Sequence, residues 1–191
     1  DKSFSDNLIK AIELVKENNF ILWFEDVFFS DKVLTNEFVD LLFKAHKNDC
    51  GYLKLSNDMP MSYESSKESK FIGELPKNIK YRSAIGLSFY KRNVLEDLLL
   101  PGLNAWELDK SKLSNTLPYK FCALTPKGSK LNYITYEHLL IKGKWNRSSI
   151  KFLKKEGFSN LLNHLGNQSL VSNFYIKLYK FRLLILKILR I

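Results

Sequence analysis

Two adjacent acids, Glu25 and Asp26, are the first residues in this sequence whose type and spacing could support chemistry. They follow an apolar run, residues 20–24, in the segment FILWFEDVFF. An aromatic and branched run without helical spacing is typical of a buried strand of a parallel sheet, whose carboxyl end is where α/β proteins build ligand sites. Carboxylates at that edge can bind a divalent cation, which usually shares its ligands with the phosphates of a nucleotide. The alternative is a solvated strand end without a ligand.

A second group of candidate residues, Trp106, Glu107 and Asp109, lies in the segment NAWELD. A positioned carboxylate can accept the proton of an attacking hydroxyl, a general-base role that typically contributes about 10²–10⁴-fold to a rate. The two acids are separated by one residue, Leu108, and we expect only one of them to serve as the base. We predict that Glu107 is the base and that Asp109 is its rival. The alternative is that Glu107 is an N-cap or first-turn acid of a helical segment that begins near Lys110.

Basic and aromatic residues supply further candidates for substrate binding. Lys142 and Lys144 flank Gly143 in the segment KGKW, where a flexible backbone would let two ammonium groups approach a diphosphate. The alternative is an ordinary solvated turn. His138 could bind a metal or a phosphate, although a lone His beside apolar residues is more often a hydrogen-bonded structural residue. Trp106 could pack beneath an acceptor sugar, and its alternative role is that of a core aromatic.

The elements that must position these residues alternate between helix and strand. Helices are indicated by apolar residues at helical spacing and by capping residues, and strands by short apolar runs. We expect helices over residues 5–18, 35–45, 92–100 and 149–165, and strands over residues 20–24, 51–55, 81–90, 117–124 and 132–135. A long polar loop, residues 56–80, interrupts them, and loops of this length are usually functional or mobile.

The positive charge of the chain is concentrated near its end. The 191 residues have a formal net charge of +10, but residues 142–191 contain 11 Lys and Arg against one acid, which leaves 19 charges of each sign in residues 1–141. On a helix, residues 170–191 would place Lys177, Lys180, Lys187 and Arg190 on one side, beside a broad apolar face. This pattern is typical of a helix that lies in an anionic membrane interface. The alternative is a terminal helix packed on its own domain or on another subunit.

Several other classes of site have no sequence signal here. The chain contains no glycine-rich phosphate loop, dinucleotide fingerprint, zinc-ligand spacing or nucleophile elbow. Its two cysteines make no disulfide framework. No run of about 18 apolar residues could span a bilayer.

Taken in order, the segments FILWFEDVFF, YRSAIGLSFYKRNVLEDLL, PGLNAWELD and KGKW resemble the later two thirds of a bacterial sugar-nucleotide glycosyltransferase domain of the GT-A type. The resemblance is to the group that builds surface polysaccharides such as lipopolysaccharide and capsule. It implies an α/β fold with a GT-A-like (Rossmann-like) mixed sheet flanked by helices, followed by a basic amphipathic C-terminal helix. It also implies that residues 1–147 form a partial domain whose upstream nucleotide-binding part is missing. Residues 148–191 would then be a helical basic appendage.

The resemblance assigns roles to individual residues. Asp26, with Glu25 beside it, matches the acidic motif that holds a divalent metal, Mn²⁺ or Mg²⁺, on the diphosphate of the donor. In the family the two acids are usually separated by one residue, whereas here they are adjacent. Glu107 matches the acid of the family's Trp-Glu segment, which implies that it is the general base toward the acceptor hydroxyl.

The expected function is therefore transfer of a sugar from a nucleotide-sugar donor to a surface glycan or a lipid-linked glycan. The enzyme would be cytoplasmic and peripheral at the inner face of the cell membrane, held at the anionic surface by its basic helix, and no nucleic-acid partner is expected. The alternative is a non-enzymatic module that binds nucleic acid or membrane through the basic tail. The tail contains aromatic residues that could stack on bases, but its density of Leu and Ile favours lipid.

Overall fold

The computed structural model describes residues 3–56, 64–65, 69–141, 143–169, 174–175 and 178. Contacts divide the chain into two compact units. Unit 1 comprises Asp1–Trp23 and Asn36–Leu131, and unit 2 comprises Phe24–Thr35 and Asn132–Ile191. In this division, residues 24–35 and 132–147 group with residues 148–191.

Unit 1 is built on a six-stranded sheet with the order β1-β6-β3-β7-β5-β4. The strands are β1 (Asn19–Leu22), β3 (Cys50–Lys54), β4 (Glu64–Ser65), β5 (Ile72–Glu74), β6 (Ser88–Lys91) and β7 (Lys120–Leu124). Only β3 and β7 pair in parallel, and every other pair is antiparallel. The sheet is therefore mixed, as expected.

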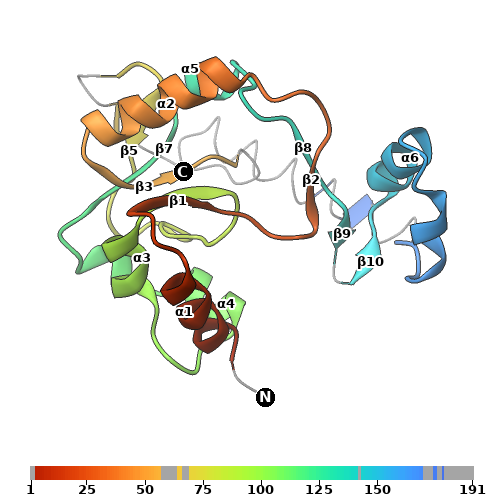
Figure 1. The fold of residues 1–191 in the computed structure, drawn as a ribbon, viewed down its shortest axis with the longest axis horizontal. Helices are drawn as coiled ribbons and strands as arrows, with labels where there is room; N and C mark the ends of the chain where they lie inside the picture. Colours follow the sequence, from red (N-terminus) through yellow and green to blue (C-terminus); the bar gives the residue numbers. More distant parts are fainter. Residues whose placement is uncertain are drawn as a thin grey trace. The chain divides into compact units, whose positions relative to one another are not determined.

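Helices lie on both sides of this sheet, with α2 and α5 on one side and α1, α3 and α4 on the other (Figure 1). They are α1 (Phe4–Leu14), α2 (Thr35–Lys47), α3 (Arg92–Leu98), α4 (Ala105–Lys110) and α5 (Pro126–Ser129), with the short 3₁₀ helix η1 (Leu113–Asn115) between α4 and β7. This arrangement confirms the α/β class.

The prediction that residues 20–24 form a buried strand of a parallel sheet is wrong. The strand β1 is the end strand of the sheet and pairs antiparallel with β6; Ile21 within it is 36% exposed, and Trp23 just after it is 40% exposed. The fully buried strand is β3, with Tyr52 and Leu53 at the centre of the core. An apolar run indicates that a strand packs against other apolar residues. It does not show whether both faces of the strand are buried or only one.

The predicted helix over residues 5–18 ends early, at Leu14, because an arginine from another element binds the end of the helix. The guanidinium of Arg92 donates hydrogen bonds to the carbonyl oxygens of Ile12 (3.0 Å), Glu17 (2.9 and 3.2 Å) and Val15. The carbonyl of Ile12 also accepts from the amide of Val15, the C-cap residue of the helix, at 3.0 Å. The contacts of Arg92 fix α1 beside the start of α3.

The predicted strand over residues 81–90 is a strand only from Ser88 onward. Tyr81 has a φ of 59°, and the buried Arg82 turns inward. Its guanidinium donates to the carbonyl oxygens of Leu75 and Pro76, both at 3.1 Å, and to that of Ser114. This charged side chain therefore holds three backbone segments together where the sequence pattern had suggested a regular strand.

The two cysteines meet in the core although they lie 72 positions apart. The Cys50 thiol donates to the Cys122 sulfur at 2.8 Å across the parallel pair β3 and β7, and both residues are buried. Contact with Cys50 and burial raise the pKa of the Cys122 thiol. Since only the thiolate is nucleophilic, we expect a disulfide reagent to modify neither thiol of the folded protein within minutes but both in guanidinium. Rapid modification of the folded protein would contradict this packing.

Unit 2 is smaller and contains two short antiparallel strand pairs. Its elements are β2 (Val27–Phe29), β8 (Tyr136–His138), β9 (Leu140–Ile141), β10 (Lys144–Trp145), α6 (Arg147–Lys155) and the 3₁₀ helix η2 (Ser159–Asn163). The strand β2 pairs with β8, and β9 with β10. Leu139, Trp145 and Leu153 form the centre of its core.

The C-terminal predictions have mixed outcomes. The single helix expected over residues 149–165 is instead α6 followed by η2, with Gly157 at a φ of 83° between them. The basic amphipathic helix expected over residues 170–191 lies outside the described residues, apart from isolated positions. Within the part of the chain that is described, no helix has the length and apolar character needed to cross a membrane.

Candidate functional site

The acidic pair lies in a tight turn at the start of unit 2. The amide of Val27 donates to the carbonyl of Phe24 at 3.1 Å, and the amide of Leu139 donates to the carbonyl of Asp26 at 2.8 Å. The turn then leads directly into the strand pair β2 and β8. The backbone of the acidic pair is thus fixed at both ends, although it does not follow a parallel strand as predicted.

Both carboxylates of this turn are available to a ligand. Glu25 is exposed and Asp26 is half-buried. Within the described ranges neither carboxylate forms an ion pair or a hydrogen bond, whereas Asp40 pairs with Lys44 and Asp49 with Lys91. Within the described ranges, a cation at this turn would therefore meet no competing protein partner of these two carboxylates.

The described residues contain no group of three or more His, Cys, Asp and Glu side chains that could hold a metal ion by themselves. Mg²⁺ is commonly bound by one or two carboxylates, with substrate phosphates and water as the other ligands. Glu25 and Asp26 fit that partial set of ligands.

Hydrogen bonds connect the acidic turn to the later candidates of unit 2. His138 pairs with Val27 across the strands β8 and β2, and its carbonyl accepts from the Ser149 hydroxyl at 2.8 Å and the Asn146 amide group at 3.3 Å. The ring of His138 packs edge-on against Tyr136, with ring centres 5.4 Å apart. The start of α6 therefore fixes β8, and β8 fixes the acidic turn.

Of the two candidate lysines, Lys144 is exposed on β10 and Lys142 lies outside the described residues. Gly143 between them has a φ of 70°, in the left-handed region that favours glycine, and it allows β9 to turn back as β10. The amide of Asn146 donates to the carbonyl of Leu139 at 2.9 Å. Because Leu139 also binds Asp26, this hairpin is tied to the acidic turn by two consecutive backbone contacts.

Glu107 lies in unit 1, in the first turn of α4. Asn104 is the N-cap, and its side-chain oxygen accepts from the amides of Trp106 and Glu107, both at 3.0 Å. The Glu107 Oε2 atom accepts from the amide of Asn104 at 2.9 Å, which completes a capping box. A capping role for Glu107 is therefore present, although the helix begins at Ala105 and not near Lys110 as expected. Trp106 beside it is 68% exposed.

Asp109 faces the core side of the same helix. Residues two positions apart on a helix differ by about 200° in direction, so Glu107 and Asp109 point to different sides. Asp109 is half-buried, and its Oδ1 accepts from the amide of Ile85 at 2.7 Å. This bond fixes the loop before β6, which is a structural role.

A buried tyrosine pair lies next to that loop. The Tyr52 and Tyr90 hydroxyls donate to the carbonyl of Ala84 at 3.0 and 3.4 Å, and the Ser88 hydroxyl donates to Tyr52 at 3.3 Å. Burial, and then the neighbouring Tyr52 and Asp109, raise the pKa of Tyr90 well above its ordinary value. Sequence analysis did not single out this network, because the two tyrosines resemble ordinary strand residues.

This raised pKa predicts a loss of stability in alkali. Tyr90 stays neutral in the folded state, whereas in the unfolded chain it ionises above about pH 10. The free energy of unfolding should therefore fall as the pH rises from about 10 toward the folded pKa, at about 1.4 kcal/mol per pH unit for this group. Urea titrations should show a shallower decline for Tyr90→Phe than for Tyr175→Phe, which alters an exposed ring. Equal declines would contradict the assignment.

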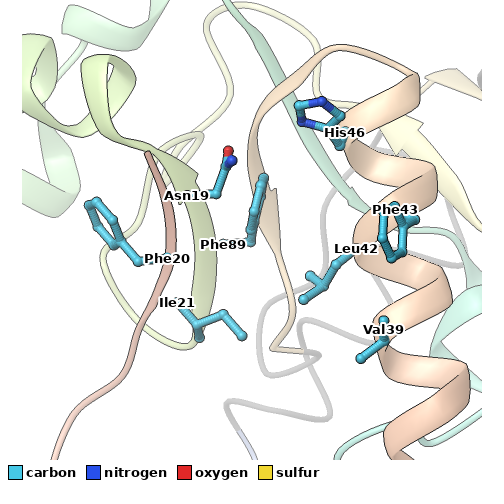
Figure 2. Close-up of a pocket in the computed structure, with 8 residues that line it drawn as sticks. All are labelled: Asn19, Phe20, Ile21, Val39, Leu42, Phe43, His46 and Phe89. Atoms are coloured by element: carbon cyan, nitrogen blue, oxygen red, sulfur yellow. The ribbon is translucent and has the colours of Figure 1, made fainter. Parts of the chain in front are cut away.

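Unit 1 also contains an apolar pocket that the sequence did not reveal. Its volume is about 510 Å³, and it lies between the sheet edge and α2. Figure 2 shows Leu42 of α2 pointing toward Phe89 of β6. The lining residues are Asn19, Phe20, Ile21, Val39, Leu42, Phe43, His46 and Phe89. The sequence signal that could have indicated this pocket is a second set of apolar residues on α2. Val39, Leu42 and Phe43 lie beside its buried residues, Leu41 and Ala45.

The structure therefore brings the candidates together in two groups. Glu25, Asp26, His138 and Lys144 belong to unit 2, and Trp106, Glu107 and Asp109 belong to unit 1. No protein-family model, no curated protein and no solved structure matches this chain.

Proposed function

We propose that this protein is a nucleotide-sugar-dependent glycosyltransferase in which Asp26, assisted by Glu25, binds a divalent metal on the donor diphosphate. The observation that carries the proposal is the pair of unpaired carboxylates in a backbone-anchored turn directly after a strand of the main sheet. The anchored carbonyl and partial burial of Asp26 make it the principal ligand. Glu25 is exposed and completes the anionic site.

The chemistry of glycosyl transfer accounts for these residue types. As the bond to the diphosphate breaks, negative charge develops on the leaving group and positive charge on the sugar. A metal held by Asp26 would stabilise the leaving group, and a cation such as Lys144 would add to that stabilisation. Lys142 is assigned the same role by its position beside Gly143.

Glu107 is the proposed general base toward the acceptor hydroxyl. Its Oε2 atom is used in the helix cap, while Oε1 has no partner within the described part of the chain. Oε1 is therefore free to accept a proton at an exposed position, where Trp106 offers a flat surface to a sugar. A base at the acceptor implies inversion at the anomeric carbon.

The acceptor is proposed to be a surface glycan or a lipid-linked glycan at the cytoplasmic face of the membrane. The excess of positive charge in residues 142–191 supports attraction to an anionic surface. Exposed Lys151, Lys154 and Lys155 of α6 contribute to that charge.

A thermal-shift panel tests the proposal. UDP-, GDP-, CMP- and dTDP-sugars are added to the full-length protein with and without Mn²⁺. We expect one nucleotide class to raise the melting temperature only with the metal, and Asp26→Asn to abolish that rise. The control Asp31→Asn alters an exposed acid of the same unit and should retain it.

The second candidate function is a non-enzymatic binding module, which the same C-terminal charge favours. If no nucleotide sugar stabilises the folded protein, two binding assays distinguish a nucleic-acid-binding module from a membrane-binding one. One measures binding to single-stranded RNA, and the other measures binding to anionic vesicles. RNA affinity should fall steeply with salt, because counterions are released on binding.

A further inference from the structure

One side of α6 carries a continuous row of basic side chains. Successive residues of an α-helix are rotated by about 100°, so Arg147, Lys151 and Lys154 lie within about 60° of one another around the helix axis. All three are exposed. Ser149 and Leu153, which are completely buried, lie on the other side of the helix. The basic face of α6 is defined here by Arg147, Lys151, Lys154 and Lys155.

The positive charge of this face is largely uncompensated. Within the described residues, the side chains of Arg147, Lys151 and Lys154 have no hydrogen bond or ion pair. Glu156 is the one acid in residues 142–191. Its carboxylate lies 3.8 Å from the Lys155 ammonium. Residues 170–191 contain five Lys and Arg and no acid, so they can only add to the positive charge of this region.

An exposed aromatic side chain follows the helix directly. Gly157 has a φ of 83° and lets the chain turn at the end of α6. The amide of Phe158 then donates to the carbonyl of Leu153 at 2.8 Å, which fixes Phe158 at the last turn of the helix. Its side chain is 49% exposed. Helices that bind a membrane interface combine Lys and Arg with aromatic or leucine side chains that enter the acyl boundary.

The composition of the basic face favours a lipid surface over a nucleic acid. Proteins that bind single strands combine a positive groove with aromatic rings on which successive bases stack. The basic face of α6 contains no aromatic residue, and Phe158 lies beyond its end. By contrast, a cluster of about four or more Lys and Arg on an amphipathic helix is typical of binding to anionic lipid headgroups. The charge of this face is therefore complementary to a bilayer that contains anionic lipid.

We propose that the basic face of α6 binds the surface of an anionic bilayer, with Phe158 entering the acyl boundary. This inference rests on the membrane location in the proposed function, and it names the surface of unit 2 that makes the contact. It uses neither the acidic turn nor α4. Vesicle binding and nucleotide-sugar binding are therefore measured separately, and one can fail without the other.

Co-sedimentation of the full-length protein with vesicles tests this proposal. Vesicles of mixed phosphatidylcholine and phosphatidylglycerol are compared with vesicles of phosphatidylcholine alone. We expect binding to the anionic vesicles only, with an affinity that falls as salt is added. Replacing Lys151 and Lys154 together with glutamine should lower the partition coefficient by at least about tenfold, because each basic residue near the surface contributes separately. Phe158→Ser should lower it by about fivefold, because the inserted ring is lost.

The matched control replaces Lys10 and Lys77 with glutamine. Both are exposed in unit 1, so the control removes the same net charge from positions outside α6. It should bind vesicles like the wild type, and the melting curve of each variant shows that it is folded.

Three results would overturn the proposal. The first is a wild-type protein that does not bind anionic vesicles, including one that binds single-stranded RNA through Lys151 and Lys154 instead. The second is wild-type binding by the variant that lacks Lys151 and Lys154. The third is an equal loss of binding in that variant and in the control, which would show that net charge alone is responsible. Vesicle binding that depends on α6, without stabilisation by any nucleotide sugar, would support this surface and refute the transferase.

Discussion

In the proposed transferase, replacing Asp26 with asparagine is expected to lower the rate of sugar transfer by at least about 100-fold, because the metal proposed to stabilise the departing diphosphate would lose its anchored ligand. Asparagine preserves the size of the side chain and its position in the turn. The backbone contacts of the turn, Val27 to Phe24 and Leu139 to Asp26, do not involve the carboxylate. The measurement is the initial rate of product formation from a labelled donor, with excess Mn²⁺.

Two companion variants sharpen this result. Glu25→Gln should reduce the rate less than Asp26→Asn, since Glu25 is exposed and its backbone makes no comparable anchoring contact. Asp31→Asn should leave the rate unchanged. If Asp26→Asn retains wild-type activity, the acidic turn has no part in catalysis.

Arg82→Met is expected to destabilise the folded state by about 3 kcal/mol or more, because it leaves three carbonyl oxygens without their charged donor. These belong to Leu75, Pro76 and Ser114. The substitution also removes the cation from above the Phe121 ring, where the guanidinium carbon lies 4.5 Å from the ring centre. Guanidinium titration followed by circular dichroism gives the free energy of unfolding.

Arg147→Met is the matched control for this prediction. Arg147 is exposed at the start of α6 and has no hydrogen bond or ion pair within the described residues. Its replacement should change the free energy of unfolding by less than about 0.5 kcal/mol, as is usual for surface positions. Similar effects of the two substitutions would show that the buried hydrogen bonds of Arg82 contribute little.

Local sequence signals were sufficient for several elements of the fold. Apolar residues at helical spacing predicted α3, and the short apolar run after the second predicted helix predicted β3. These elements are determined by neighbouring residues, so a local pattern can identify them. The α/β class followed from their alternation.

Other features depend on contacts that no local pattern contains. The apolar run of residues 20–24 indicated burial, but the position of β1 at the sheet edge depends on which strands pair. The residues around Arg82 resemble a strand in sequence. They do not form one, because the Arg82 side chain turns inward to bind carbonyl oxygens of two other segments, which the local sequence does not reveal. Cys50 and Cys122 meet only because β3 and β7 are neighbours in the sheet.

The candidate site shows the same distinction. The acidic pair and the Trp-Glu segment were visible as residue types, and the first-turn role of Glu107 was already an alternative at the sequence level. What the sequence could not provide was the hydrogen bond from Leu139 that anchors Asp26, since those residues lie far apart in the chain. The sequence also did not show that a helix starts at Ala105 or that Asp109 is bonded to the amide of Ile85.

The most direct test of the central claim is the binding of Mn²⁺ by the full-length protein, followed by the electron paramagnetic resonance signal of the free ion. The nucleoside diphosphate sugar alone binds some of the ion and lowers the signal. Addition of the protein should lower the signal further, and this additional decrease is the quantity measured. Asp26→Asn should abolish this additional decrease, and Asp31→Asn should retain it. A metal–diphosphate site at the acidic turn would be contradicted if the wild-type protein caused no additional decrease. It would also be contradicted if Asp26→Asn caused the same additional decrease as the wild type.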